Sequence, residues 1–130
     1  IGKAKLVEEG QELSIITYGM GVHWAKAATK KLNVKADILD LRTLLPLDKE
    51  SIFKSVKKTN KVLILHEDCL TGGIGGELSA LINEHCFEDL DAPVIRCASM
   101  DTPVPFAVEL ENQFLPLSEL EEKIDKLIQY

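Results

Sequence analysis

The sequence lacks the features of membrane proteins and of nucleic-acid-binding domains. No apolar run approaches the ~20 residues that cross a bilayer, and no signal-peptide pattern opens the chain. Fifteen basic residues against 21 acidic ones give a net charge of -6, without any cluster of Lys and Arg interleaved with aromatic residues. Because a duplex-binding domain usually presents a basic face, neither nucleic acid nor membrane is expected as a partner.

Cysteine is also scarce, with only Cys69, Cys86 and Cys97 along the chain. Their number is odd, no C-x-x-C occurs, and no Cys/His pairing has zinc spacing, so the sequence indicates neither a disulfide framework nor a structural metal. Three reduced thiols fit a cytoplasmic location, or alternatively an organelle matrix. We expect them to be small buried hydrophobic residues.

The composition is that of an ordinary globular protein, with 45% hydrophobic and 28% charged residues in a chain of 130. This length suits a single domain, residues 1–130. The chain starts at Ile1 without an initiator Met, so we expect it to be part of something longer.

Strand and helix patterns alternate along the chain, which favours a parallel sheet with helices on both faces. We predict a three-layer α/β/α sandwich with a mostly parallel sheet of about five strands. Asp48 is predicted to cap one helix, and Ser118 with Glu121 to form a capping box for the last. Three prolines argue against a helix in residues 99–117. The predicted strands are residues 4–8, 13–18, 36–41, 62–65 and 94–98, and the predicted helices are 22–32, one after residue 48, one after residue 76 and one from residue 118.

A first candidate site is the turn Gly19-Met20-Gly21, with Asp40 near the end of the following strand. Glycines between a strand and a helix, followed by an acid about twenty residues on, are typical of dinucleotide-binding folds. Trp24, however, stands where the third glycine would be, and its bulk opposes close helix–strand contact. A tight turn is the favoured interpretation. The alternative function for the whole chain is a standalone Rossmann-like nucleotide-binding module or a plain interaction module.

A second candidate is the loop expected after residue 65, where His66-Glu67-Asp68-Cys69 leads to the glycines of residues 72–76. A histidine and two acids there could perform acid–base chemistry or bind a cation. The glycines could instead let another chain approach closely, and this packing interpretation is favoured. His23, near a helix start, could face a partner. His85 falls on the apolar stripe of its helix and is expected in the core.

Several stretches together resemble one family. They are residues 16–19 (ITYG), 40–48 (DLRTLLPLD), 55–59 (SVKKT), 66–67 (HE), 71–73 (TGG), 84–87 (EHCF), 90–94 (LDAPV) and 101–106 (DTPVPF). In order and spacing they resemble the C-terminal domain of transketolase-like thiamine-diphosphate enzymes. Within that group they resemble the β subunit of 2-oxo-acid dehydrogenase decarboxylating components. The TGG and EHCF stretches favour the branched-chain (2-oxoisovalerate) type over the pyruvate type.

The resemblance implies a parent enzyme that uses thiamine diphosphate and Mg²⁺ to decarboxylate a 2-oxo acid and passes the acyl group to lipoyl on an acyltransferase. In this family other domains bind the cofactor, and the Gly-Asp-Gly start of the metal motif does not occur here. No catalytic, cofactor-binding or metal-binding residue is therefore assigned, and the chain alone is expected to be inactive.

The resemblance further implies that this domain supports subunit assembly, with two-fold association, and docks the dihydrolipoyl acyltransferase. An acidic surface suits a basic docking partner. Tyr130 is close to where related chains stop. The residues predicted to form the subunit or partner interface are Tyr18, Met20, His23, His66, Glu67, Gly72, Gly73, Gly75, Gly76 and Tyr130.

Overall fold

The computed structural model describes all residues from 1 to 130. The strands are β1 (Lys5–Glu8), β2 (Leu13–Thr17), β3 (Ala36–Asp40), β4 (Val62–Cys69) and β5 (Ile95–Ser99). The helices are α1 (Met20–Leu32), α2 (Lys49–Thr59), α3 (Ile74–Cys86), the short 3-10 helix η1 (Phe87–Asp89), α4 (Val108–Phe114) and α5 (Leu117–Ile128). None of these helices is long and apolar enough to cross a membrane.

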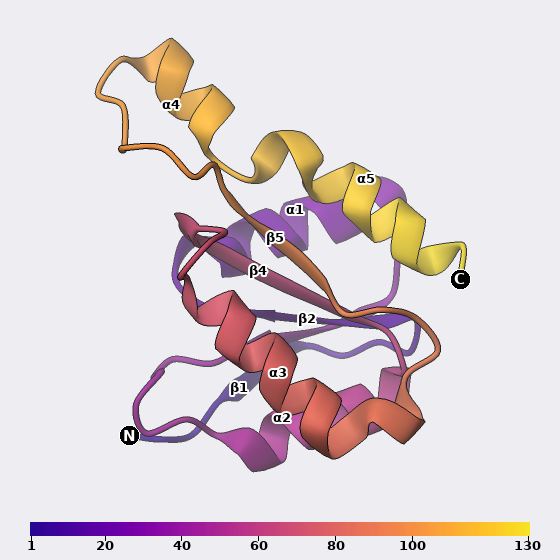
Figure 1. The fold of residues 1–130 in the computed structure, drawn as a ribbon. Helices are drawn as coiled ribbons and strands as arrows, with labels where there is room; N and C mark the ends of the chain where they lie inside the picture. The colour runs from indigo at the N-terminus through magenta and orange to yellow at the C-terminus, as the bar shows by residue number, and fades with distance from the viewer.

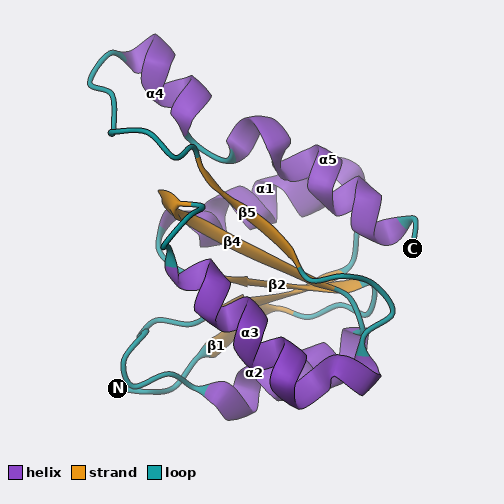
Figure 2. Cartoon of the chain, in the orientation of Figure 1, coloured by secondary structure: helices purple, strands orange, loops and turns teal.

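The five strands form one sheet in the order β1-β3-β2-β4-β5. Strands β3, β2, β4 and β5 are parallel, whereas β1 pairs antiparallel with β3 at the edge. Helices α1 and α5 cover one face of the sheet, and α2 and α3 cover the other (Figures 1 and 2). The predicted three-layer α/β/α sandwich with five strands, mostly parallel, is confirmed.

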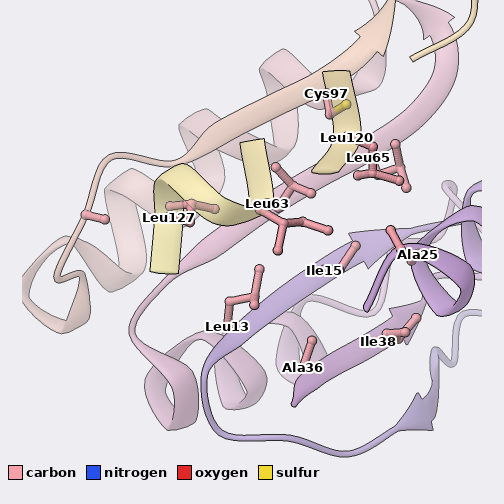
Figure 3. Close-up of a cluster of buried hydrophobic side chains, with 13 residues drawn as sticks. Leu13, Ile15, Ala25, Ala36, Ile38, Leu63, Leu65, Cys97, Leu120 and Leu127 are labelled. Carbon is pink, nitrogen blue, oxygen red and sulfur yellow. The ribbon is translucent and has the colours of Figure 1, made fainter. Parts of the chain in front are cut away.

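Two apolar cores, one on each face, hold the layers together. Alternate residues of the central strands point to opposite faces, so Ile15 and Leu63 pack under α1 and α5 (Figure 3). Ile16 and Ile64 pack on the opposite face with Ile52 of α2. Burial on both faces explains the near-continuous apolar strands that the sequence contains. Cys86 and Cys97 belong to these cores, as the sequence predicts, whereas Cys69, also expected to be buried, is only partly buried in the last position of β4. All three cysteines are free.

Helix ends show where local sequence signals were sufficient and where they were not. Asp48 caps α2 as predicted, because its carboxylate accepts a hydrogen bond from the Ser51 backbone N–H at 3.2 Å. A second bond from the Ala4 N–H and those from Ser51 hold the pKa of Asp48 below its usual value, against the opposing effect of burial. The predicted Ser118–Glu121 capping box is wrong, since α5 begins at Leu117 after Pro116 and no side chain caps it.

Two further elements differ from the prediction. Strand β4 continues to Cys69, so His66 lies within a strand and not in a loop. Helix α4 occupies part of residues 99–117, where no helix was expected. The prolines of that stretch lie outside the helix, with Pro103 and Pro105 in the loop before α4 and Pro116 between α4 and α5. Their positions at helix boundaries are compatible with the fixed φ angle of proline.

Candidate partner-binding surface

The carboxyl ends of the four parallel strands meet at one edge of the sheet, the carboxyl edge. Helix α1 leaves β2 on one face, whereas α3 leaves β4 on the other. The crevice between two such connections is where open α/β sheets usually bind ligands. Here the rings of Tyr18, after β2, and His66, in β4, stack at that position with centroids 6.4 Å apart and planes 15° apart.

His66 is completely buried and both of its ring nitrogens are hydrogen-bonded. Nε2 accepts from the backbone N–H of Gly75 at 3.2 Å, so Nδ1 carries the proton and donates it to the Asp68 carbonyl at 3.0 Å. Burial lowers the pKa of His66, although Asp68 opposes this shift. The ring is a neutral acceptor that satisfies one of the free N–H groups at the start of α3.

The glycines of residues 72–76 have different surroundings. A Cβ on Gly75 would overlap His66 Nε2, and a Cβ on Gly73 would overlap the Cys69 carbonyl oxygen. Gly72 is exposed with φ of +80° and open space around it, whereas a Cβ on Gly76 would meet only Arg96 Nη1, at 3.8 Å. Gly73 and Gly75 therefore serve the close approach of α3 to β4 within this chain. A bulky residue at Gly73 is therefore expected to disturb folding.

Glu67 and Asp68 lie beside the stacked rings of Tyr18 and His66 and face solvent. Tyr18 is half-buried, and its burial, reinforced by the Asp68 and Glu67 carboxylates, raises the pKa of its phenol. The hydroxyl of Tyr18 is therefore neutral at physiological pH. A buried neutral histidine, a neutral phenol and two solvated carboxylates form a packed, acidic surface.

The Gly19-Met20-Gly21 turn also has an internal explanation. A Cβ on Gly21 would overlap the Thr17 hydroxyl oxygen, and Gly19 adopts φ of +58°. One carboxylate oxygen of Asp40 accepts from the nearby Arg42 N–H at 3.0 Å. The turn thus meets the steric needs of the β2–α1 connection, which supports the tight-turn interpretation over a nucleotide cradle.

The other predicted interface residues are dispersed. Met20 and His23 are exposed at the start of α1, near the carboxyl edge. Tyr130 follows α5 at the opposite end of the domain, where Lys61, which precedes β4, reaches the Ile128 carbonyl at 3.3 Å. His85 was expected in the core but is exposed, and its ring lies 4.8 Å from that of Phe53. Cys86 takes the inward position on α3 instead.

The sequence reasoning missed one feature of the carboxyl edge. Residues 100–115, here called the arm, leave β5 and project beyond the sheet to α4 (Figure 1). At its base, Asp101 accepts two hydrogen bonds from Thr71, at 2.6 and 2.8 Å. The apolar residues of this stretch were the available signal. Its prolines, however, favoured the interpretation as a loop.

Carboxylates that could hold Mg²⁺ and a diphosphate do not converge in this chain. No group of three or more His, Cys, Asp or Glu side chains is arranged to ligate a metal. The rings of Tyr18 and His66 stack on each other at the carboxyl ends of β2 and β4. The residues present do not fit the thiamine-diphosphate cofactor that the resemblance implies for the parent enzyme.

Comparison with known proteins places this architecture in a family. A 2-oxoisovalerate dehydrogenase subunit beta of Bacillus subtilis is 45% identical over 119 residues, covering 88% of this chain and 36% of that protein. A pyruvate dehydrogenase E1 component subunit beta of Porphyra purpurea is 48% identical over 115 residues, covering 86% of this chain and 35% of that protein. The chain thus spans about a third of the length of these relatives.

Structural comparison agrees on the fold. A split-gene transketolase, solved as an inactive beta4 tetramer, superposes with a TM-score of 0.81 at 23% identity over 98% of this chain and 42% of that one. The profile of the family described as "Transketolase, C-terminal domain" matches residues 2–119. The chain therefore belongs to the transketolase C-terminal domain family.

Proposed function

We propose that this chain is the C-terminal domain of the β subunit of a thiamine-diphosphate-dependent 2-oxo-acid dehydrogenase. The observation that supports this most strongly is the 45–48% identity to β subunits of such enzymes within the matched family. The sequence identities to β subunits of the branched-chain type and of the pyruvate type fall in the same range. The TGG and EHCF stretches favour 2-oxoisovalerate as the substrate.

In this proposal the domain contributes assembly and docking, and other parts of the enzyme supply the chemistry. The cofactor would be held by other parts of the enzyme, and it would supply there the electron sink that decarboxylation of a 2-oxo acid needs. This chain supplies a rigid α/β body whose carboxyl edge is acidic and whose buried His66 fixes α3 against β4. The lipoyl-bearing acyltransferase is the proposed docking partner, and a basic surface on it would suit the net charge of -6.

Activity of the full-length protein tests the enzymatic part. We would co-express it with its α subunit and measure decarboxylation of 2-oxoisovalerate and of pyruvate, with thiamine diphosphate, Mg²⁺ and an artificial electron acceptor. The intact protein is expected to decarboxylate 2-oxoisovalerate faster than pyruvate. A full-length protein from which residues 1–130 of this chain are removed is expected to lose assembly and activity together. An intact, assembled protein that decarboxylates neither acid would refute the proposal.

Docking needs a separate measurement. Binding of the intact enzyme to the immobilised acyltransferase is expected to weaken as salt rises, because complementary charge drives the encounter. Binding that is absent at low salt, in a preparation that decarboxylates the 2-oxo acid, would remove the docking role and leave the enzymatic assignment in place.

A further inference from the structure

The two edges of the sheet are not protected in the same way. An edge strand presents a row of unpaired backbone N–H and C=O groups, to which a strand of another chain can add. In β1 this row is interrupted, because its register with β3 shifts between Leu6 and Glu8. Strand β5, at the other edge, carries a single charged side chain, Arg96, in five residues. Its protection must therefore come from outside the strand.

The outward backbone groups of β5 can be identified from its pairing. Successive residues of a strand direct their backbone N–H and C=O groups to alternate sides. The Ser99 carbonyl faces the rest of the sheet, because it accepts a hydrogen bond from the Leu70 N–H, directly after β4, at 3.1 Å. The backbone groups of Arg96, Ala98 and Met100 therefore face outward. These three residues form the outer side of the strand, here called the β5 edge.

Contacts from two other elements cover the ends of the β5 edge. Lys123, on the helix α5 that runs alongside β5 in Figure 1, donates from Nζ to the Arg96 carbonyl at 3.1 Å. Glu119, one turn earlier in α5, holds the same ammonium at 2.7 Å. At the other end, the Met100 N–H donates to the Phe114 carbonyl at 3.0 Å. Both contacts occupy backbone groups that an added strand would need.

Lys123 is the more easily removed of these two covers. Phe114 is buried, so its carbonyl is fixed by the packing of the fold, whereas Lys123 contributes a side chain that is 25% exposed. Ala98, between the two covers, is half-buried and makes no hydrogen bond outside the sheet. Loss of the lysine would therefore leave the Arg96 carbonyl and both Ala98 groups unpaired in one row. A lysine at a sheet edge opposes pairing because an incoming strand would have to bury its charge.

We infer that Lys123 blocks pairing of the β5 edge with the same edge of a second copy of this chain. Without the lysine, two β5 edges could pair antiparallel about Ala98, because the N–H and C=O of that residue are available on each copy and a two-fold contact is self-complementary. The product would be one sheet that continues across two domains. The inference does not depend on the proposed function. It implies that association of this domain with its partners is directed away from the β5 edge by a repulsive element.

Sedimentation of the full-length protein tests this role. Lys123→Met keeps most of the apolar stem and removes the charge with its donors. Lys126→Met is the matched control, since Lys126 is an exposed lysine one turn later in the same helix. Lys123→Met is expected to populate a species of twice the wild-type mass, in a proportion that rises with protein concentration, whereas Lys126→Met keeps the wild-type mass. Addition of Ala98→Pro to Lys123→Met is expected to restore the wild-type mass, because proline removes the N–H and is tolerated where that N–H faces outward from an edge strand.

Three results would overturn the inference: a folded Lys123→Met protein that keeps the wild-type mass, equal association of the two lysine variants, or association that survives Ala98→Pro. Hydrogen exchange adds a readout on the wild type alone, which does not depend on whether a variant folds. The Ala98 amide is expected to exchange about tenfold faster than the Met100 amide, because only Met100 donates outward to a carbonyl. Equal protection of the two amides would mean that another strand already covers the β5 edge, which would also overturn the inference.

Discussion

His66 Nε2 accepts a hydrogen bond from the Gly75 backbone N–H at 3.2 Å, and this contact joins the middle of the sheet to the start of α3. The His66 side chain thus caps the N-terminus of α3 from the neighbouring strand β4. Gly73, at the cap position itself, provides no side chain for this purpose. The contact needs a glycine at position 75 because any Cβ there would occupy the position of the ring nitrogen.

Replacement of Gly75 by alanine is therefore expected to destabilise the protein. Overpacking of a buried contact costs about 1–3 kcal/mol, and here the hydrogen bond would be lost as well. Gly76→Ala is the matched control in the same helical turn, since its Cβ would meet only Arg96 Nη1 at 3.8 Å. Urea unfolding should show a lower free energy of unfolding for Gly75→Ala. For Gly76→Ala it should be unchanged or higher by up to about 1 kcal/mol. Equal effects of the two changes would contradict the close packing of α3 on His66.

The lowered pKa of His66 predicts a specific acid sensitivity. The folded state binds this proton less readily than the unfolded state, whose histidine pKa is about 6.5. The stabilisation is thus fully present above about pH 6.5 and is lost as the pH falls toward the lower folded pKa. Protonation would remove the Nε2 acceptor and place a positive charge at the N-terminus of α3.

The measurement is the free energy of unfolding at pH 7.5 and 5.5 for the wild type and for His66→Gln. Glutamine retains hydrogen-bonding capacity but does not titrate. We expect the wild type to lose more stability between these pH values than the variant does. Parallel pH profiles would show that another group is responsible for the acid sensitivity.

A buried carboxylate forms a second polar centre, below the α2 face. Asp37 accepts hydrogen bonds from the Gly10 N–H at 3.0 Å, the Lys58 ammonium at 2.5 Å and the Ser55 hydroxyl at 2.8 Å. Asp37→Ala is expected to lower the free energy of unfolding by about 3–5 kcal/mol, because it strands these donors. Glu121→Ala breaks the exposed pair with Lys31 and should cost less than about 1 kcal/mol. A small effect at Asp37 would mean that water replaces the carboxylate.

Thr17 offers a change in the opposite direction. Its hydroxyl is buried next to Gly21 without a hydrogen-bond partner. Thr17→Val preserves the shape and removes an unsatisfied polar group, so stability is expected to rise by about 1 kcal/mol. Thr29→Val is the contrasting control, since that buried hydroxyl donates to the Ala25 carbonyl at 2.9 Å, and its loss should destabilise. Calorimetric melting temperatures that move in the same direction for both variants would contradict this difference.

The sequence was sufficient to predict the alternation of elements and the two-faced core. Apolar runs such as residues 62–65 are buried on both sides, and the Asp48 cap is a local signal that the structure bears out. The order of the strands could not be derived, because it depends on pairings between distant segments. The identity of the antiparallel edge strand as the neighbour of β3 is of this kind.

The candidate site was harder to predict, for reasons specific to its residues. His66 follows apolar residues and precedes two acids, so it resembles the start of a loop. Pairing of Cys69 with Ser99 nevertheless extends β4 past it. The glycines of the following turn indicated close approach correctly, but the sequence could not show that Gly73 and Gly75 approach this chain's own strand. The exposure of apolar residues in the arm depends on how residues 100–115 are placed relative to the sheet, which no local pattern encodes.

The strand order also bears on how fast the chain can fold. No two paired strands are joined by a hairpin, because β1 and β2 are consecutive but separated by β3, and every parallel pair is connected through a helix. Loop-closure entropy must therefore be overcome before any sheet contact forms, which slows folding in proteins of this kind. β2 takes part in two of these distant pairings, with β3 and with β4. The centre of the sheet is therefore complete only when β3 and β4 are both available to β2, so ribosomal synthesis must reach β4 before these pairings can all form.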